Sequence, residues 1–178
     1  MSALIPEPRM KGVTRAYTIE TMVDNAKSAS FASILDQCGR NLFCWVLPSW
    51  QRDHVWCRSQ QQAFIEGIFD GFGTGYYVVN EPDWYGDGEP RPMSGWLLDG
   101  QQRITAIRDF MAGEFTIFEG IFFEDIDRVT RVKRFLRQPF PCLELEYQSE
   151  EGRLKELYQR LNFGGTPHTQ ADLERVRA

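Results

Sequence analysis

Residues 96–103 form the densest group of chemically useful side chains in the sequence. The apolar residues 96–98 predict a strand, which leads into the turn Asp99-Gly100, and a helix is expected to begin directly after it. The first backbone N–H groups of a helix have no intrahelical partner and carry partial positive charge, so they bind anions. Gly100 has no side chain that would keep a ligand away from this backbone. The segment therefore predicts an anion site at a helix N-terminus.

Arg103 lies on the apolar side of the same predicted helix, which we expect from about Gln102 to Ala112. At about 100° per residue the apolar side chains span one arc, and Arg103 falls inside it. The residues of this arc are Ile104, Ile107, Phe110 and Met111. An inward guanidinium needs a partner, because an unpaired buried charge is costly. That partner is either a carboxylate such as Asp99 or the phosphate of a ligand, which arginine binds with two hydrogen bonds.

Gln101 and Gln102 stand beside this anion site. A glutamine in such a place orients the attacking water in some nucleotide-hydrolysing proteins. The alternative is that both are ordinary residues of a first helical turn.

Residues 48–56, PSWQRDHVW, form a second group, on a predicted loop. Trp50 and Trp56 are candidates for stacking on a base, and Gln51 and Arg52 are candidates for holding phosphate. The competing interpretation places both tryptophans in the core and pairs Arg52 with Asp53.

Two further groups carry polar chemistry. Asn162 precedes the glycine pair at 164–165 and is a candidate to bind a ribose or a metal, or else simply belongs to a helix end. Arg131, Arg134 and Arg137 recur every three residues and are either a solvated helix face or a contact for nucleic acid or a partner.

The elements that position these groups alternate between helices and strands without a strict repeat. This pattern predicts an α+β fold with a small mixed β-sheet flanked by helices. Helices are expected over 19–26, 31–37, 59–70 (with a capping box Ser59-x-x-Gln62), 102–112, 124–137, 150–162 and 169–177. Strands are expected over 42–48, 76–79, 96–98 and 142–147, with a hairpin over 115–123 and a long loop over 80–95.

Length and charge limit the possible functions. The 178 residues suit one domain, with residues 1–16 as an N-terminal arm or lead-in strand. No apolar run is long enough for a membrane helix and no signal peptide is visible, so a cytoplasmic location is expected. The net charge of −5 makes general nucleic-acid binding less favourable. The four cysteines form no CxxC pair, and Cys44, His54 and Cys57 do not have a recognised zinc spacing.

Taken in order, PSWQRDHVW, WLLDGQQRITAI and RLNFGGTPHTQADL resemble the family that forms the N-terminal part of GmrSD-type restriction enzymes. The resemblance extends over about residues 30–175, and DGQQR is its most specific part. Two positions depart from the family pattern: His168 replaces an apolar residue, and Phe163 replaces a small polar one. The family is similar to the ParB/sulfiredoxin fold, so a core of that kind is expected over 30–175.

The resemblance implies a nucleotide phosphate site, because relatives of the wider fold bind or hydrolyse nucleotides. Its motifs match Gln51 and Arg52, then Asp99 to Arg103, then Asn162. It implies that a nucleoside triphosphate binds with Mg²⁺ and is hydrolysed slowly, with Asp99 as metal ligand or proton acceptor, in DNA-linked defence or counter-defence or in DNA metabolism. Oxygen ligands suit Mg²⁺.

Three other functions remain open at this point. Nucleotide binding without hydrolysis would make the domain a switch. A metal-dependent nuclease would use Asp99 with further carboxylates, and a non-enzymatic protein of a phage or mobile element would bind a host or defence protein instead.

Overall fold

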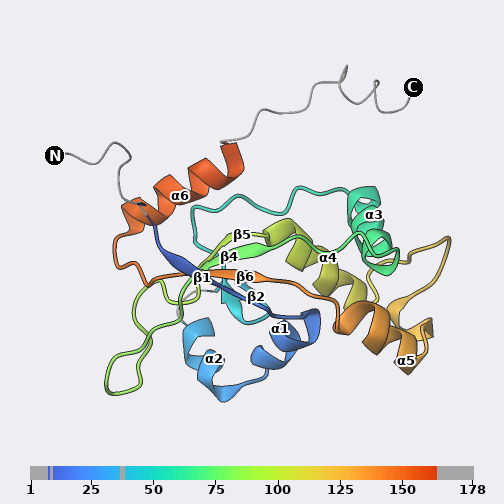
Figure 1. The fold of residues 1–178 in the computed structure, drawn as a ribbon, viewed down its shortest axis with the longest axis horizontal. Coiled ribbons are helices and arrows are strands. Elements are labelled where there is room, and N and C mark those ends of the chain that lie inside the picture. The colour runs from blue at the N-terminus through green and yellow to red at the C-terminus, as the bar shows by residue number, and fades with distance from the viewer. Residues whose placement is uncertain (1–7, 9, 37–38, 164–178) are drawn as a thin grey trace.

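A computed structural model of the protein describes residues 8, 10–36 and 39–163. Its centre is a four-stranded sheet in the order β1-β6-β4-β5 (Figure 1). β4 and β6 are parallel, whereas β1 with β6 and β4 with β5 are antiparallel. The predicted α+β fold with a small mixed sheet is therefore confirmed. The strands are β1 (Gly12–Arg15), β4 (Tyr77–Asn80), β5 (Leu97–Asp99) and β6 (Cys142–Leu145).

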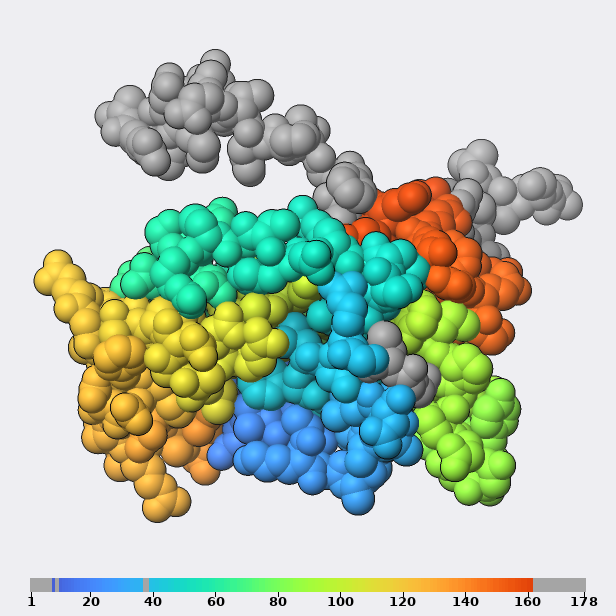
Figure 2. All heavy atoms as spheres, turned by 180° about the vertical axis from the view of Figure 1, so that it is seen from behind, coloured from blue at the N-terminus to red at the C-terminus, as the bar shows by residue number. Residues whose placement is uncertain are grey.

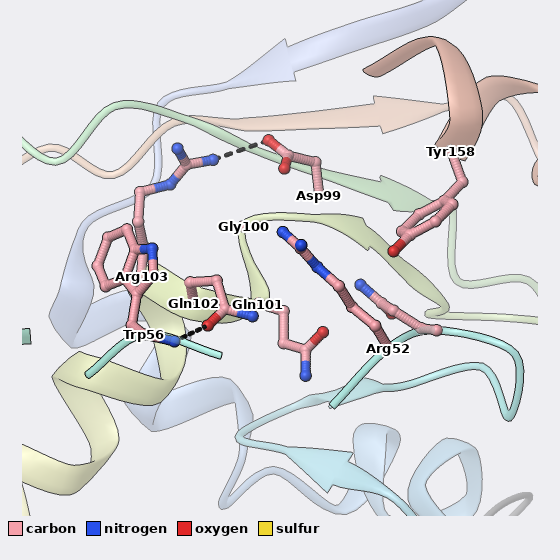
Figure 3. A pocket seen from close by; sticks show the side chains of 9 residues that line it. Arg52, Trp56, Asp99, Gly100, Gln101, Gln102, Arg103 and Tyr158 are labelled. Carbon is pink, nitrogen blue, oxygen red and sulfur yellow. Dashed lines mark hydrogen bonds and ion pairs between the residues drawn. The ribbon is translucent and has the colours of Figure 1, made fainter. Parts of the chain in front are cut away.

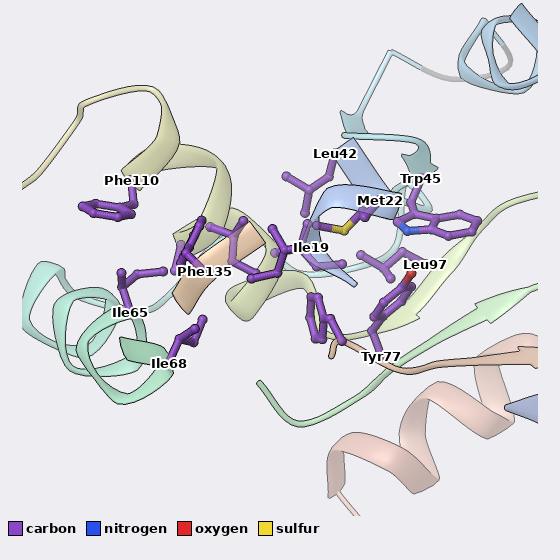
Figure 4. Close-up of a cluster of buried hydrophobic side chains, with 14 of the residues drawn as sticks. Ile19, Met22, Leu42, Trp45, Ile65, Ile68, Tyr77, Leu97, Phe110 and Phe135 are labelled. Carbon is purple, nitrogen blue, oxygen red and sulfur yellow. The ribbon is translucent and has the colours of Figure 1, made fainter. Parts of the chain in front are cut away.

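The two faces of this sheet are covered differently. Tyr77 and Val79 of β4 point into the larger cluster of buried side chains, together with residues of α1 (Ile19–Asn25), α3 (Arg58–Phe69) and α4 (Gln101–Met111), as Figure 4 shows in part. Val78 points to the opposite face and packs with Leu154 of α6. This alternation is what an extended strand between two layers requires. Helix α6 (Glu151–Phe163), predicted over 150–162, covers that second face.

The N-terminal helices begin with side-chain caps. Thr18 accepts the backbone N–H of Thr21 and begins α1, and Ser28 caps α2 (Ala29–Leu35). Gly12–Arg15 is paired as β1, so this part of residues 1–16 is the lead-in strand rather than a free arm.

The start of α3 differs from the prediction. The expected capping box of Ser59 and Gln62 is wrong, because Cys57 is the N-cap and Gln60 closes the box by accepting the backbone N–H of Cys57 at 2.9 Å. Gln62 instead donates to the carbonyl of Thr116 at 2.8 Å, and it thereby joins α3 to the chain after α4.

The apolar run 42–48 is not one strand. It forms two short antiparallel strands, β2 (Asn41–Leu42) and β3 (Trp45–Val46), joined by a turn in which Phe43 has φ 54°. Leu42 and Trp45 are both buried. A fully buried segment has a continuous apolar sequence whether its backbone is extended or turned, so the sequence alone does not distinguish the two.

Residues 115–137 also differ from the prediction. The expected hairpin reduces to one isolated bridge between Ile117 and Ile121, across a turn that contains Gly120. The helix expected over 124–137 is interrupted, because Asp127 caps a new helix by accepting the N–H groups of Val129 and Thr130. The observed elements are the 3-10 turn η1 (Phe123–Asp125), α5 (Arg128–Arg131) and the π-helical turn η2 (Val132–Leu136).

The predicted long loop over 80–95 is present, with one isolated bridge between Trp84 and Pro90. Seen from behind in Figure 2, this loop and α6 lie at one end of the molecule and residues 113–137 lie at the other. None of the helices in the described part of the chain is long and apolar enough to span a membrane. The helix expected over 169–177, the glycine pair at 164–165 and the departure at His168 lie outside the described residues.

Candidate functional site

Three segments that are far apart in sequence line one pocket of about 180 Å³ (Figure 3). The loop after β3 contributes Gln51, Arg52 and Trp56, the junction of β5 and α4 contributes Asp99 to Arg103, and α6 contributes Tyr158. The first two motifs singled out in the sequence therefore meet in space. Tyr158 was not predicted, since a tyrosine in an amphipathic helix gives no signal in the sequence alone.

The N-terminus of α4 is open toward this pocket. Its N-cap is Gly100, at φ 101°, which offers no side-chain cap to the first N–H groups of the helix. A Cβ atom at Gly100 would lie 2.5 Å from Cβ of Tyr77, so the turn packs directly on β4. This close packing explains why a glycine occupies the position.

Arg103 has two partners within the protein. Its Nη2 donates to Oδ2 of Asp99 at 2.7 Å and to the carbonyl oxygen of Tyr76 at 2.7 Å. Both side chains of the ion pair are 27% exposed, so solvent reaches the pair. The carboxylate alternative considered for Arg103 is thus present in this structure, while the Nε of Arg103 is buried without a partner among the described residues.

Arg52 is placed quite differently. It is exposed, and within the described ranges no hydrogen bond or ion pair holds its guanidinium. The suggested pairing with Asp53 is wrong, because Asp53 pairs with Arg40 at 3.1 Å. In Figure 3 the Arg52 side chain extends from its loop toward Gly100 and Asp99. The pocket therefore contains a cation that is available to an incoming anion.

Gln51 is a further polar residue of the pocket lining, and it offers a hydrogen-bond acceptor. Its residue is only 5% exposed, and its Oε1 has no hydrogen-bond partner in the part of the chain that is described. Buried polar atoms are nearly always paired, so an orphan acceptor in a pocket wall indicates a site for a donor that a ligand or ordered water supplies. Gln101, 6% exposed, lines the same wall.

Arg40 was missed by the sequence analysis, yet it shapes the loop that carries these residues. Its Nη1 donates to the carbonyl oxygens of Pro48 at 3.2 Å, Ser49 at 3.4 Å and Gln51 at 2.9 Å. Arg40 stands in an irregular segment without a motif, so nothing in its sequence neighbourhood signals this role. It acts as a positioning residue for Gln51 and Arg52.

We expect Arg40→Ala to lower the free energy of unfolding by about 1–3 kcal/mol, since three loop carbonyls lose a charged donor. Urea denaturation measures the loss. Arg153→Ala is the matched control, because the one ion pair of Arg153 with another described residue is an exposed pair with Glu150, and such pairs contribute about 0–1 kcal/mol. Equal effects of the two substitutions would show that Arg40 does not hold the loop.

Gln102 holds the C-terminal end of the 48–56 loop against α4. Its Oε1 accepts the backbone N–H groups of Val55 at 2.9 Å and of Trp56 at 3.0 Å. The carbonyl end of this side chain is therefore occupied in holding the loop on α4, and only its NH₂ group is left to face a ligand or a water.

We expect Gln102→Met, which removes the acceptor at similar size, to lower the free energy of unfolding by about 1–2 kcal/mol. Gln102→Glu keeps an acceptor oxygen and places a negative charge at a helix N-terminus, so it should stay within about 0.5 kcal/mol of the wild type. Thermal unfolding of both variants tests this prediction. A loss of the same size in both would mean that the acceptor is not what matters.

The remaining predicted residues lie in other surroundings. Trp50 packs edge-on against Trp96 and Tyr158, with ring centroids 6.1 and 5.1 Å away, so it belongs to the packing under α6 rather than to the pocket lining. Trp56 lines the pocket, and its ring packs against the ring of Phe64 with the two centroids 5.5 Å apart. Asn162 is in the last turn of α6, and its side chain is outside what the structure describes.

The three arginines of the basic group are used within the protein. Arg134 donates to the carbonyl of Phe69 and lies over its ring, Arg131 lies over the ring of Phe123, and Arg137 is 3.8 Å from Glu20. They are not part of the pocket, and their contact with DNA stays a prediction.

Metal-binding side chains are sparse here. Among the described residues no group of three His, Cys, Asp or Glu side chains is placed to hold a metal, and Asp99 is the carboxylate of the pocket. Burial lowers the pKa of His54, so its imidazole stays neutral at pH 7. The hydroxyl of Ser59 lowers the pKa of the Cys57 thiol at the N-cap of α3.

The fold and the pocket define an α+β domain with an arginine- and glutamine-lined pocket at a helix N-terminus. The family profile described as "GmrSD restriction endonuclease, N-terminal domain" matches residues 31–138, and the chain belongs to this family. This range holds every pocket residue except Tyr158, and the family's description connects the chain with restriction systems. No curated protein and no solved structure matches the chain significantly, so similarity to the ParB/sulfiredoxin fold stays a prediction.

Proposed function

We propose that this domain binds the phosphates of a nucleoside triphosphate in the pocket at the start of α4. The observation that carries the proposal is the free guanidinium of Arg52 in a pocket whose wall is the uncapped N-terminus of a helix. A guanidinium and backbone N–H groups are the donors that phosphate oxygens accept most favourably. The family description adds the setting, a restriction system that acts in DNA-linked defence.

The ion pair of Asp99 and Arg103 fits a ligand that carries a cation for the carboxylate and an anion for the guanidinium. A magnesium–triphosphate complex offers Mg²⁺ to the carboxylate and phosphate oxygens to the guanidinium. Sites built from one carboxylate and substrate phosphates are usual for Mg²⁺, because this ion keeps several of its waters. Asp99 would hold the metal, which would supply charge neutralisation on the phosphates, and Arg103 would exchange its carboxylate for a phosphate oxygen.

Slow hydrolysis is the second part of the proposal. Gln101 and the NH₂ group of Gln102 line the same wall and are the groups available to position a water. A nuclease receives less support, because the described lining of the pocket contains one carboxylate and lacks a second for another metal ion. Turnover separates an enzyme from a nucleotide-controlled switch.

The test is a titration of the purified protein with ATP, GTP, CTP and UTP, each with and without Mg²⁺. A ligand that binds only the folded state raises the melting temperature. We expect a rise that requires Mg²⁺ and that Asp99→Asn reduces, with phosphate release measured in the same samples. No shift with any of the four nucleotides at millimolar concentration would overturn the proposal.

A further inference from the structure

The pocket is smaller than a whole nucleotide needs. Its volume of about 180 Å³ is below the roughly 300 Å³ at which pockets begin to enclose complete drug-sized ligands. Most of its lining residues are arginine, glutamine or aspartate, whose side chains suit phosphates, and Trp56 and Tyr158 are the aromatic residues of the lining. If phosphates fill it, as the proposed function requires, the nucleoside has to lie on the rim.

Tyr76 forms the rim on the side of Arg103. Its carbonyl oxygen accepts the Nη2 of Arg103 at 2.7 Å. Tyr77, the first residue of β4, points into the larger cluster of buried side chains. The side chain of Tyr76, which directly precedes it, is therefore directed to the opposite side, where Val78 packs with Leu154 of α6. Tyr158 of α6 lines the pocket, so Tyr76 is on the same side of the sheet as the pocket.

Tyr76 is 51% exposed, and within the described residues neither another ring nor a side-chain hydrogen bond holds it. Its neighbour Tyr77 is completely buried. A single exposed aromatic residue is ordinary on a protein surface. Tyr76 is distinguished by its place beside a pocket that holds a free guanidinium and the buried, unpaired oxygen of Gln51.

Phe72 provides the contrast within the same loop. It is 87% exposed, but it lies against α3, where a Cβ atom at Gly67 would be 3.8 Å from its ring. Within the described residues it makes no hydrogen bond with a residue that lines the pocket, whereas the carbonyl oxygen of Tyr76 accepts Arg103.

We propose that the exposed ring of Tyr76 is the stacking surface for the nucleobase of the bound nucleoside triphosphate. Stacking on an aromatic ring accepts any base, since every base has a π-face. The site should consequently bind nucleoside triphosphates more tightly than inorganic triphosphate, with little preference among the four bases. This inference rests on the proposed function and extends it to the base.

The test compares two probes by calorimetry, ATP and inorganic tripolyphosphate, each with Mg²⁺. Tyr76→Ala should weaken ATP binding by about 10-fold and leave tripolyphosphate binding unchanged. Tyr76→Phe keeps the ring and should bind both probes like the wild type. Phe72→Ala is the control for loss of an exposed aromatic side chain and should change neither affinity.

The outcomes distinguish a failure of the phosphate pocket from a failure of the base site. If the wild type binds neither probe, the phosphate pocket and the base site both fail. If the wild type binds tripolyphosphate as tightly as ATP, or if Tyr76→Ala weakens both probes equally or neither, the base site alone is overturned. Unchanged tripolyphosphate binding also reports that each variant is folded.

Discussion

Replacing Arg52 with alanine should weaken Mg²⁺–nucleotide binding by about 10–100-fold and leave the melting temperature of the free protein unchanged. The loss in affinity corresponds to about 1.5–3 kcal/mol, the usual contribution of hydrogen bonds to a charged group. Stability should not change because the Arg52 guanidinium makes no hydrogen bond or ion pair in the described structure. Calorimetric titration and thermal unfolding of the same preparation measure both quantities.

Arg128→Ala is the matched control for this substitution. Arg128 is also exposed, has no ion pair among the described residues, and lies on α5 away from the pocket. The Arg128→Ala substitution removes the same charge and should change the nucleotide affinity by no more than about twofold. It therefore measures how much of the Arg52→Ala effect comes from net charge alone. Arg52→Lys should recover part of the loss, because lysine keeps the charge without the planar pair of donors. An unchanged affinity in Arg52→Ala would show that phosphate binds elsewhere.

Arg52 is a cleaner test than Arg103, although Arg103 has the more recognisable motif. Arg103 donates to both Asp99 and the carbonyl of Tyr76, so its removal disturbs the junction of β4, β5 and α4 as well as any ligand contact. A loss of binding in Arg103→Ala would therefore have two explanations. Under the proposed function the two arginines would have different roles: Arg52 would be available to phosphate from the start, and Arg103 would become available once Asp99 binds Mg²⁺.

The parts of the site that sequence predicts are those fixed by local rules. A strand followed by Asp99-Gly100 and a helix is a short-range pattern, and the structure has β5, the Gly100 N-cap and α4 at these positions. The convergence of the 48–56 loop on this junction is not local. Sequence predicts this convergence only through the resemblance of the ordered motifs to a family, and the family match over residues 31–138 supports the resemblance.

What sequence could not predict depends on long-range contacts made by side chains of ordinary type. Arg40 is one of many arginines, and only the fold shows that its donors meet three carbonyls of the loop. Gln102 was one of two glutamines considered for orienting a water, and only the fold shows that its carbonyl oxygen also accepts the N–H groups of Val55 and Trp56. Trp50 was a candidate for stacking on a base, and its surroundings are Trp96 and Tyr158. In each case the residue type allows several roles, and distant neighbours determine which one is realised.

Gly100→Ala should lower the free energy of unfolding by about 2–6 kcal/mol and abolish nucleotide binding. Two costs add at this position. A non-glycine residue at φ 101° is strained by about 1–3 kcal/mol. Its Cβ would also lie 2.5 Å from Cβ of Tyr77, and relieving such an overlap costs about 1–3 kcal/mol more. For a chain of this size the melting temperature should fall by about 5–15 °C.

Gly113→Ala separates these two costs, because Gly113 follows the other end of the same helix. Its φ is also positive, at 75°, but no atom lies within 4 Å of the position that a Cβ would take. It should therefore show the backbone strain alone, about 1 kcal/mol, and leave nucleotide binding intact. The difference between the two variants measures how tightly the start of α4 is pressed against β4. If both variants lost the same stability, that close packing would not explain the glycine, and the N–H groups of α4 would need another reason for facing the pocket.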